Sequence, residues 1–376
     1  NSGRVIGKGL EAVCNVIEKD STYGTIHRFL HGVNASPCVH IVDRDKNLLE
    51  VNGVPVTILQ KARNPMDIDW RSHGVRVVVD ATGAFNDPTV PENDPKGSLR
   101  GHLAAGAEKV LNSAAFKIKD KTLKTPPDAA TFIYGINHDI YNPTRHHVIS
   151  AASCTTTALA HMLKPLFNHF HADKLLTASM STIHAATNTQ SVLDSVPKAG
   201  DKDLRKNRSA LNSIILTSTN AAKALEEVIP QIRQVGFLAD SVRIPLQTES
   251  LIILNITIQS EIDLNGDCNV THDALNDYYR EAAGGAQKGL LICSESQNVP
   301  SDLSGAKAAV VIEAVETHTR TAFVKLDLGL VKDLGISRTV EIPVTHAKIF
   351  GWYDNEYGSY TNLLGDLTVH VRKGLD

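Results

Sequence analysis

Cys154 stands among the hydroxylic residues Ser153, Thr155 and Thr156, shortly after an apolar run that ends at Ile149. Beyond these residues, apolar side chains recur at three- and four-residue steps, which predicts a helix. Cys154 is therefore expected at a strand-to-helix junction, where free backbone N–H groups and the helix dipole favour thiolate over thiol. The alternative is a small thiol that only packs between elements. Because a packing position has no need for three neighbouring hydroxyls, we predict that Cys154 is a nucleophile.

A histidine follows at a distance that could bring it to this thiol. His184 comes at the end of a predicted strand over 175–183, and polar residues such as Thr187 surround it in sequence. In a Cys–His pair, the imidazole acts first as base and later as acid. A lone histidine is more often structural, and the chain contains 16 of them. We nevertheless predict that His184 is the base, because its sequence neighbours are polar.

Hydroxyl groups and a cation near this pair indicate anion binding. Thr187, Thr219 and Asn220 stand in turns or before helices, where free backbone N–H groups suit a phosphate. Ordinary helix capping explains each of them equally well. Arg243 interrupts the apolar run 242–245, and a buried arginine requires a partner. That partner is either an anionic ligand or a structural carboxylate.

The elements that must position these residues are of two kinds. Before Cys154, short strands alternate with helical segments; the β-branched run over 75–80 is typical of a parallel sheet, and Asn52-Gly53 predicts a hairpin. After Cys154 the predicted strands are longer. We expect them over 250–258, 308–315, 321–328 and 346–353, with helices over 212–225, 273–283 and 362–371. This pattern predicts an α/β domain joined to an α+β domain.

Composition excludes several function classes. The chain has 376 residues, a net charge of −3 and 42% hydrophobic residues, so we expect neither nucleic acid nor a membrane as partner. No apolar run approaches the roughly 18–20 residues of a membrane helix. The five cysteines show no metal-ligand spacing, which favours a reducing, cytoplasmic compartment and no metal site.

Eight motifs, in order along almost the whole chain, resemble the glyceraldehyde-3-phosphate dehydrogenases. Four surround the predicted chemistry: Ala152-Ser153-Cys154-Thr155-Thr156, the segment 181–187 (STIHAAT), the segment 218–224 (STNAAKA) and the segment 352–358 (WYDNEYG). The other four lie before them: DSTYG over 20–24, RNP over 63–65, ATG over 81–83 and GINH over 135–138.

The resemblance implies an α/β architecture with three parts. Residues 1–152 would form a Rossmann-type parallel-sheet domain for the dinucleotide, incomplete at its N-terminus because the family's Gly-x-Gly-x-x-Gly loop is absent from the given sequence. Residues 153–352 would form an α+β catalytic domain with a large mixed sheet. Residues 353–376 would return to the dinucleotide-binding domain. A homotetramer is also implied, with the polar stretch 191–208 reaching a neighbouring subunit's cofactor site.

The resemblance further implies an oxidoreductase of glucose metabolism that uses NAD or NADP. It would convert glyceraldehyde 3-phosphate and inorganic phosphate to 1,3-bisphosphoglycerate through a thioester on Cys154, with His184 as base. The remaining implied site residues are Thr187 and Arg243 for the substrate phosphate, Ser153, Thr155, Thr219 and Asn220 for inorganic phosphate, and Asn1, Ser2, Arg4, Arg63, Thr82, Gly83, Ser113 and Asn355 for the cofactor.

Departures from the family pattern define the alternatives. Ser2 stands where NAD-specific members carry a carboxylate, and Arg4 is close by, so a 2′-phosphate is less strongly rejected. Insertions over 87–101, 117–128 and 331–344 mark a divergent branch. An erythrose-4-phosphate dehydrogenase, in which water resolves the thioester, is one alternative. A binding or regulatory protein that keeps the fold without turnover is another.

Overall fold

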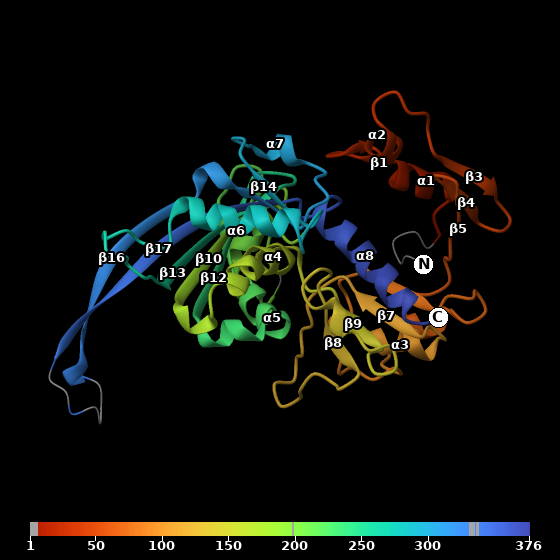
Figure 1. Cartoon of the computed structure of the whole chain (residues 1–376). Coiled ribbons are helices and arrows are strands. Elements are labelled where there is room, and N and C mark those ends of the chain that lie inside the picture. The colour runs from red at the N-terminus through yellow and green to blue at the C-terminus, as the bar shows by residue number, and fades with distance from the viewer. Residues whose placement is uncertain (1–6, 198, 331–334, 336–337) are drawn as a thin grey trace. The chain divides into compact units, whose positions relative to one another are not determined.

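The computed structural model describes residues 7–197, 199–330, 335 and 338–376. The chain forms two compact units (Figure 1). The first contains Asn1–Phe132, Ile140–Ala152 and Leu364–Asp376, and the second contains Ile133–Asp139 and Ser153–Leu363. Each unit therefore combines segments that are distant in sequence.

A four-stranded parallel sheet forms the centre of the first unit. Its order is β6 (Val77–Asp80), β7 (Lys109–Asn112), β9 (Val148–Ser150) and β8 (Ala129–Thr131). Every residue of β7 and β9 is buried, and helix α3 (Leu99–Ala104) contributes Leu99 to the core against the sheet. The parallel sheet predicted from the β-branched run is confirmed.

The N-terminal part of the first unit holds shorter elements. They are α1 (Leu10–Glu18), β1 (Lys19–Asp20), β2 (Gly24–Thr25), α2 (Ile26–His31), β3 (Val39–Asp43), β4 (Leu48–Val51) and β5 (Val54–Thr57). The turn between β4 and β5 has positive φ at Asn52 (52°) and Gly53 (78°). Two consecutive positive φ angles match the right-handed twist of a hairpin, so the predicted hairpin is confirmed.

The second unit is built on a large mixed sheet of eight strands. Along the sheet the order is β11 (Ile215–Thr217), β12 (Gly236–Ile244), β10 (Leu175–Ala185), β13 (Ser250–Gln259), β17 (Thr339–Tyr353), β15 (Val310–Glu313) and β14 (Leu291–Ser294), with β16 (His318–Asp327) also paired to β17. The pairs β10–β12 and β14–β15 are parallel, and the other pairs are antiparallel.

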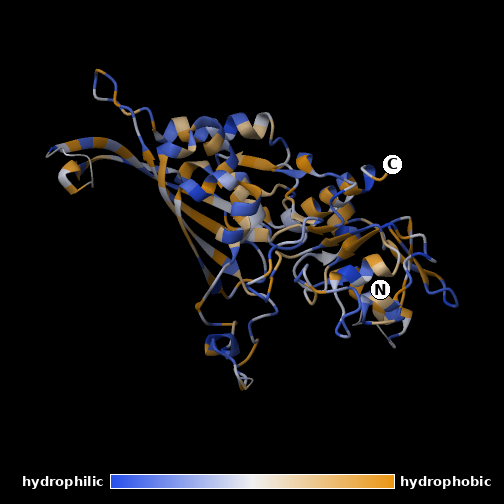
Figure 2. Cartoon of the chain, turned by 90° about the horizontal axis from the view of Figure 1, so that it is seen from below, coloured by the Kyte–Doolittle hydropathy of each residue, from blue (hydrophilic) through white to orange (hydrophobic). Residues whose placement is uncertain are grey.

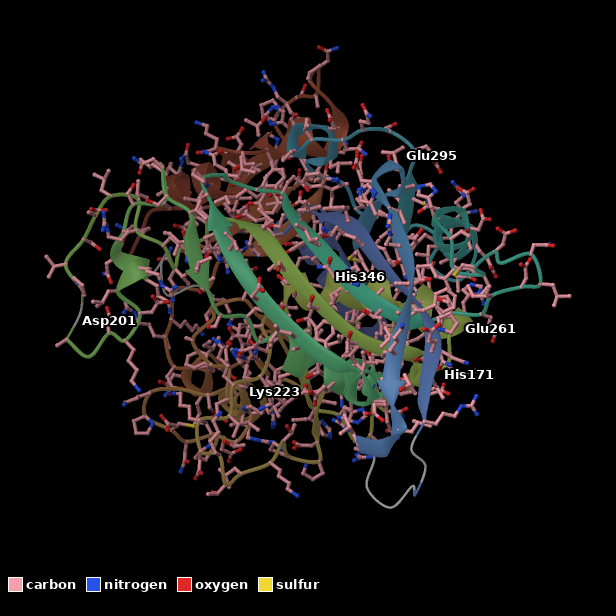
Figure 3. All side chains as sticks on the ribbon, turned by 90° about the vertical axis from the view of Figure 1, so that its left-hand side faces the viewer. His171, Asp201, Lys223, Glu261, Glu295 and His346 are labelled. Carbon is pink, nitrogen blue, oxygen red and sulfur yellow. The ribbon has the colours of Figure 1, made fainter. Side chains whose placement is uncertain are left out.

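Helices cover one face of this sheet. Figure 1 shows α4 (Cys154–His169), α5 (Ala221–Val228) and α6 (His272–Gly284) along it, and α7 (Pro300–Leu303) is a short helix nearby in sequence. Along β13, Ile252, Leu254 and Ile256 are buried, and Figure 2 shows hydrophobic and hydrophilic residues alternating along such strands. Figure 3 looks onto the other face, where His346 of β17 is exposed. This alternation is expected for a sheet buried on one side.

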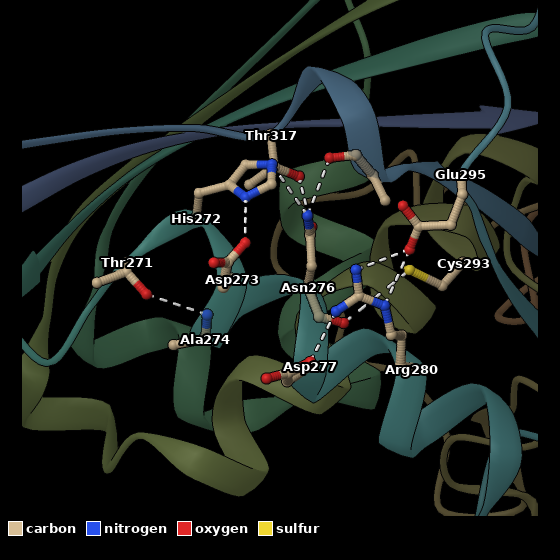
Figure 4. A network of polar contacts seen from close by, with 11 residues as sticks. Thr271, His272, Asp273, Ala274, Asn276, Asp277, Arg280, Cys293, Glu295 and Thr317 are labelled. Atoms are coloured by element: carbon tan, nitrogen blue, oxygen red, sulfur yellow. Dashed lines mark hydrogen bonds and ion pairs between the residues drawn. The ribbon is translucent and has the colours of Figure 1, made fainter.

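Polar contacts hold α6 in place (Figure 4). Thr271 caps the helix, its hydroxyl oxygen accepting a hydrogen bond from the Ala274 N–H at 3.1 Å. The buried Asn276 donates to the carbonyl of Ala314 at 2.9 Å and accepts from the Thr317 hydroxyl at 2.8 Å. The α6 helix is thus fixed to the segment between β15 and β16 by side-chain hydrogen bonds.

The predicted fold class, a parallel-sheet α/β domain with an α+β domain, is confirmed. The last helix, α8 (Ser359–Lys373), contains the predicted helix over 362–371. The helix expected over 212–225 is wrong in its first half, because Ile215 is buried in β11 beside β12 and α5 begins only at Ala221. Among the described residues, no helix is long and apolar enough to cross a membrane.

Candidate active site

The N-terminus of α4 positions Cys154. Ser153 is the cap: its Oγ accepts a hydrogen bond from the Thr156 N–H at 3.2 Å, and Cys154 is the first residue of the helix. Ala152, just before the cap, has a φ of 58°, which a residue with a Cβ rarely adopts. A tight turn therefore leads into the helix and fixes Cys154 at its positive end.

His184 lies beside the thiol, near the end of β10. The distance from Cys154 Sγ to His184 Nε2 is 3.5 Å. The other ring nitrogen, Nδ1, is 2.8 Å from the carbonyl oxygen of Ala185, and a carbonyl can only accept. Nδ1 therefore carries the proton of the neutral ring, and the lone pair of Nε2 faces the sulfur. This is the tautomer that a base for the thiol requires.

Arg243 is aligned with His184 by the sheet itself. The parallel register of β10 and β12 places His184 opposite Arg243. The Nη1 of Arg243 also donates to the Ala185 carbonyl, at 3.2 Å. Its Nε is buried and has no hydrogen-bond partner in the described part of the chain. A carbonyl neutralises no charge, so this cation can still pair with an anion.

Burial determines the protonation of the pair at rest. It raises the pKa of the Cys154 thiol, against the lowering effects of the Thr155 backbone N–H and of the Arg243 cation. Burial, followed by the charge of Arg243, lowers the pKa of His184 to about 4. The resting pair is a thiol with a neutral imidazole. The thiolate expected from the helix terminus alone is thus not favoured, because desolvation outweighs the dipole.

Tyr353 is a residue of the site that was not predicted from the sequence. It is buried at the end of β17, and its hydroxyl is 2.9 Å from Thr155 Oγ1 and 2.8 Å from Thr182 Oγ1. Its ring meets that of His184 edge to face, with centroids 6.0 Å apart. Tyr353 thus links α4 to β10 beside His184. In the sequence, the only indication of this role was its position two residues before Asn355, within the segment 352–358.

Two successive hydrogen bonds link the end of β10, through Ser250, to Asn355. The backbone N–H of Ala185 donates to Ser250 Oγ at 3.1 Å, so the hydroxyl hydrogen of Ser250 is free to donate to Asn355 Oδ1, at 2.9 Å. This orients the amide oxygen of Asn355 toward the protein and leaves its NH₂ group to donate to a ligand. A carboxamide oxygen is a suitable acceptor for it.

The candidate phosphate residues are ordered by local contacts. The Thr187 backbone N–H and hydroxyl both donate to Gln190 Oε1, at 3.0 and 3.1 Å. Thr219 Oγ1 accepts from the Ala221 N–H at 3.1 Å at the start of α5, and Asn220 is exposed. Within the described part of the chain, Thr187, Thr219 and Asn220 make no hydrogen bond to Cys154, His184 or Arg243.

Three candidate cofactor residues of the first unit, Thr82, Gly83 and Ser113, lie just beyond the carboxyl ends of two neighbouring strands. Thr82 and Gly83 follow β6, and Ser113 follows β7, its N–H donating to the Asp80 carbonyl at 2.9 Å. Asp80 also holds the backbone N–H and hydroxyl of Thr82, at 2.8 and 2.6 Å. Ligands of open parallel sheets bind outside this carboxyl edge. Arg63 is exposed, and Asn1, Ser2 and Arg4 lie outside the described residues.

Comparison with known proteins identifies relatives along most of the chain. Residues 153–328 match the family model described as the C-terminal domain of glyceraldehyde 3-phosphate dehydrogenase. The glyceraldehyde-3-phosphate dehydrogenase of Streptomyces coelicolor is 36% identical over 332 residues, covering 88% of this chain and 82% of the relative. That of Geobacillus stearothermophilus is 35% identical with the same two shares. Glyceraldehyde-3-phosphate dehydrogenase 1 of Bacillus cereus is 31% identical, over 97% of this chain and 89% of the relative.

Proposed function

The chain belongs to the glyceraldehyde-3-phosphate dehydrogenase family of oxidoreductases, and from that premise we propose how its own residues carry the reaction. The substrates would be glyceraldehyde 3-phosphate, a nicotinamide dinucleotide and inorganic phosphate. One observation supports this most strongly: Cys154 Sγ lies 3.5 Å from the unprotonated Nε2 of His184. A neutral thiol needs such a base at the moment when it adds to an aldehyde.

Cys154 and His184 would share the proton transfers. His184 Nε2 takes the thiol proton as the sulfur adds to the aldehyde carbon, and it returns that proton to the oxygen to give a hemithioacetal. A bound nicotinamide would supply the acceptor for the hydride. As the hydride leaves, His184 takes the hydroxyl proton again, and a thioester remains on Cys154. Inorganic phosphate then attacks the acyl carbon, the C–S bond breaks, and an acyl phosphate leaves.

Two anion subsites would serve this sequence. Arg243 and Thr187 would hold the substrate phosphate, because the Arg243 cation lies beside the Cys–His pair with an unpartnered Nε. Ser153, Thr155, Thr219 and Asn220 would hold the attacking phosphate at the start of α4 and of α5. Helix termini favour such anions.

Each of the two units offers candidate residues for the dinucleotide. The NH₂ group of Asn355 is left to donate to the nicotinamide carboxamide, and Arg63, Thr82, Gly83 and Ser113 would line the adenosine side. Asn1, outside the described residues, is a further candidate from the resemblance. The carboxyl edge of β6 and β7 supports this assignment, because it exposes the small Gly83 with a φ of 68°; a residue without Cβ allows close approach of a ligand.

The reaction is tested by following nicotinamide absorbance with glyceraldehyde 3-phosphate, NAD and phosphate. Wild-type turnover is expected to depend on inorganic phosphate. Cys154→Ser should lose on the order of a thousandfold or more, because a serine hydroxyl is scarcely ionised near neutral pH. Turnover of erythrose 4-phosphate without phosphate would favour the hydrolytic alternative. A folded protein with no turnover, in which iodoacetamide still alkylates Cys154, would favour a regulatory role.

For the nucleotide we propose use of NADP at a rate comparable with NAD. Ser2 offers no carboxylate to repel a 2′-phosphate, and Arg4 offers a cation to accept it. Arg4→Ala should therefore lower kcat/KM for NADP selectively. A preference for NAD above about a hundredfold, nearly 3 kcal/mol, would refute dual use, and equal losses for both nucleotides would show that Arg4 does not contact the 2′ position.

We also propose a homotetramer. Several apolar side chains of the segment 191–214 are exposed in the single chain, among them Val192 (66%), Val196 (89%) and Ile214 (74%). Exposed apolar residues gathered in one loop commonly mark a protein interface. Light scattering coupled to size exclusion would give a mass near four times 40.7 kDa.

A further inference from the structure

Glu249 occupies an unusual position next to the hydrogen bonds that link β10 to Asn355. It precedes β13, between Thr248 and Ser250, and these two neighbours contact the turn that follows β17. The Thr248 hydroxyl donates to Asp354 Oδ1 at 3.4 Å, and the Ser250 hydroxyl donates to Asn355 Oδ1 at 2.9 Å. Glu249 therefore lies at the junction that fixes the orientation of the Asn355 amide.

The backbone of Glu249 is strained. Its φ is 67°, and asparagine, aspartate and glycine adopt such values far more readily than glutamate does. In the described chain the positive-φ residues other than glycine, asparagine and aspartate are Ala152 and Glu249. Ala152 immediately precedes the cap of the Cys154 helix. Strain of this kind persists where the surrounding structure over-determines it, often at functional sites.

The Glu249 side chain is buried, and only 1% of the residue is exposed. Among the residues that the structure describes, neither of its carboxyl oxygens has a hydrogen-bond partner. An ionised carboxylate in such a place is costly, so the neutral acid is favoured. Among the described titratable groups, the one that acts electrostatically on Glu249 is Asp354, also a carboxylate and also buried. Thr248 and Ser250, on either side of it, are uncharged.

Asp354 is committed to the same turn. Its Oδ1 accepts from the Glu356 N–H at 2.8 Å, and its Oδ2 accepts from the Gly305 N–H at 2.8 Å. Both of these hydrogen bonds to Asp354 come from backbone N–H groups. A second charge on Glu249 would repel it with no donor nearby to compensate. Separation of the two carboxylates would pull Thr248 and Ser250 away from Asp354 and Asn355.

We propose that Glu249 is a positioning residue, which keeps the Asn355 turn in its dinucleotide-binding arrangement only while its carboxyl group is protonated. The inference rests on the proposed function, in which Asn355 holds the nicotinamide carboxamide. Dinucleotide affinity then falls as the solution becomes alkaline, through a group that takes no part in the chemistry.

Calorimetric titration with NAD and with NADP at pH 7 and pH 9 tests this proposal. Burial and Asp354 raise the pKa of Glu249 to about 8, so binding that requires the protonated acid should weaken about tenfold between these two pH values. In Glu249→Gln, whose amide cannot ionise, the ratio of the two Kd values should approach one. Glu249→Gly, which suits the left-handed backbone, should give the same result if the glutamine variant folds poorly.

Glu261→Gln is the matched control, because Glu261 is an exposed glutamate beyond the other end of β13; it should keep the wild-type ratio. If dinucleotide binding weakens equally in wild type and in both Glu249 variants, the role of Glu249 is overturned and the proposed function is not. Failure of wild type to bind either dinucleotide at either pH would overturn the proposed function itself. As a readout without ligand, the unfolding midpoint of wild type should fall between pH 6 and pH 8.5 more than that of Glu249→Gln.

Discussion

The carbonyl oxygen of Ala185 accepts hydrogen bonds from His184 Nδ1 and from Arg243 Nη1, at 2.8 and 3.2 Å. This single acceptor orients the base and the nearby cation together. The tautomer of His184 follows from it. Burial, and then the charge of Arg243, lowers the pKa of His184. We therefore expect the proton of the resting pair on the sulfur, and His184 neutral.

The pH dependence of Cys154 alkylation measures that resting state. Because burial raises the pKa of the thiol, the rate of reaction with iodoacetamide in the free protein should keep rising from pH 7 to pH 9, about tenfold per unit while the thiol predominates. The rate is obtained from mass spectrometry of the modified cysteine, with Cys154→Ser correcting for the other four. A plateau reached below pH 7 would instead indicate a preformed thiolate–imidazolium pair.

At the scale of elements, two helices begin in the same way but in different surroundings. Ser153 caps α4 and Thr271 caps α6, each accepting a hydrogen bond from the backbone N–H three residues later. The α6 cap belongs to the network in Figure 4, around Asn276 and Arg280. The α4 cap fixes the terminus that carries Cys154.

Replacement of each cap by alanine separates stability from catalysis. Ser153→Ala and Thr271→Ala should each lower the free energy of unfolding by about 1 kcal/mol, the usual value of an N-cap. Denaturant titration measures this loss. Thr271→Ala should keep its turnover, whereas Ser153→Ala should also lose turnover and raise the KM for inorganic phosphate. Equal turnover of the two variants would show that Ser153 serves only as a cap.

Element prediction from sequence succeeded where one local signal dominates. Asn52-Gly53 allows few conformations other than a tight turn. The β-branched run over 75–80 favours a strand of a parallel sheet, although Val79 of β6 is exposed. The segment 212–225 failed because Ile215 is buried by β12, which lies some twenty residues later, whereas its spacing alone fits a helix. The polar neighbours of Glu249 in sequence favour an exposed turn at this position. The burial of Glu249 depends on the pairing of β13 with β17, about a hundred residues away, and no local pattern reports such pairing.

At the scale of the whole molecule, buried titratable groups set the pH of maximum stability. Burial lowers the pKa of His161 to about 3 and that of His184 to about 4. Below the ordinary histidine pKa of 6.5, the unfolded chain binds these protons and the folded chain does not. The free energy of unfolding therefore decreases as the pH drops below 6.5. Glu249 acts oppositely: its pKa rises from 4.5 to about 8, so the stability it contributes is lost as pH rises toward 8.

The free energy of unfolding should therefore be greatest near pH 6.5. Below that value the histidines outweigh the single glutamate, and burial also lowers the pKa of His146, which acts in the same direction. Above it Glu249 gives a net decline below about 1.4 kcal/mol per pH unit, because the histidines partly offset it up to about pH 7.5. Urea titrations between pH 4 and pH 9 give the curve. In Glu249→Gln the decline above pH 6.5 should vanish. Wild-type stability that still increases between pH 7 and pH 8 would contradict this assignment.

The first unit is assembled from segments that are distant in sequence, and this has a consequence for the order in which the protein is synthesised and folds. Residues Leu364–Asp376 belong to that unit, although the whole second unit except Ile133–Asp139 lies between them and the rest of it. Arg76, directly before β6, donates to the carbonyl of Leu375 at 2.9 Å. This contact beside β6 forms only after residue 375 has been added. A ribosome adds residues in one direction at a finite rate. The first unit therefore stays incomplete until residues 364–376 have been added, and the ribosome must translate the second unit before it reaches them.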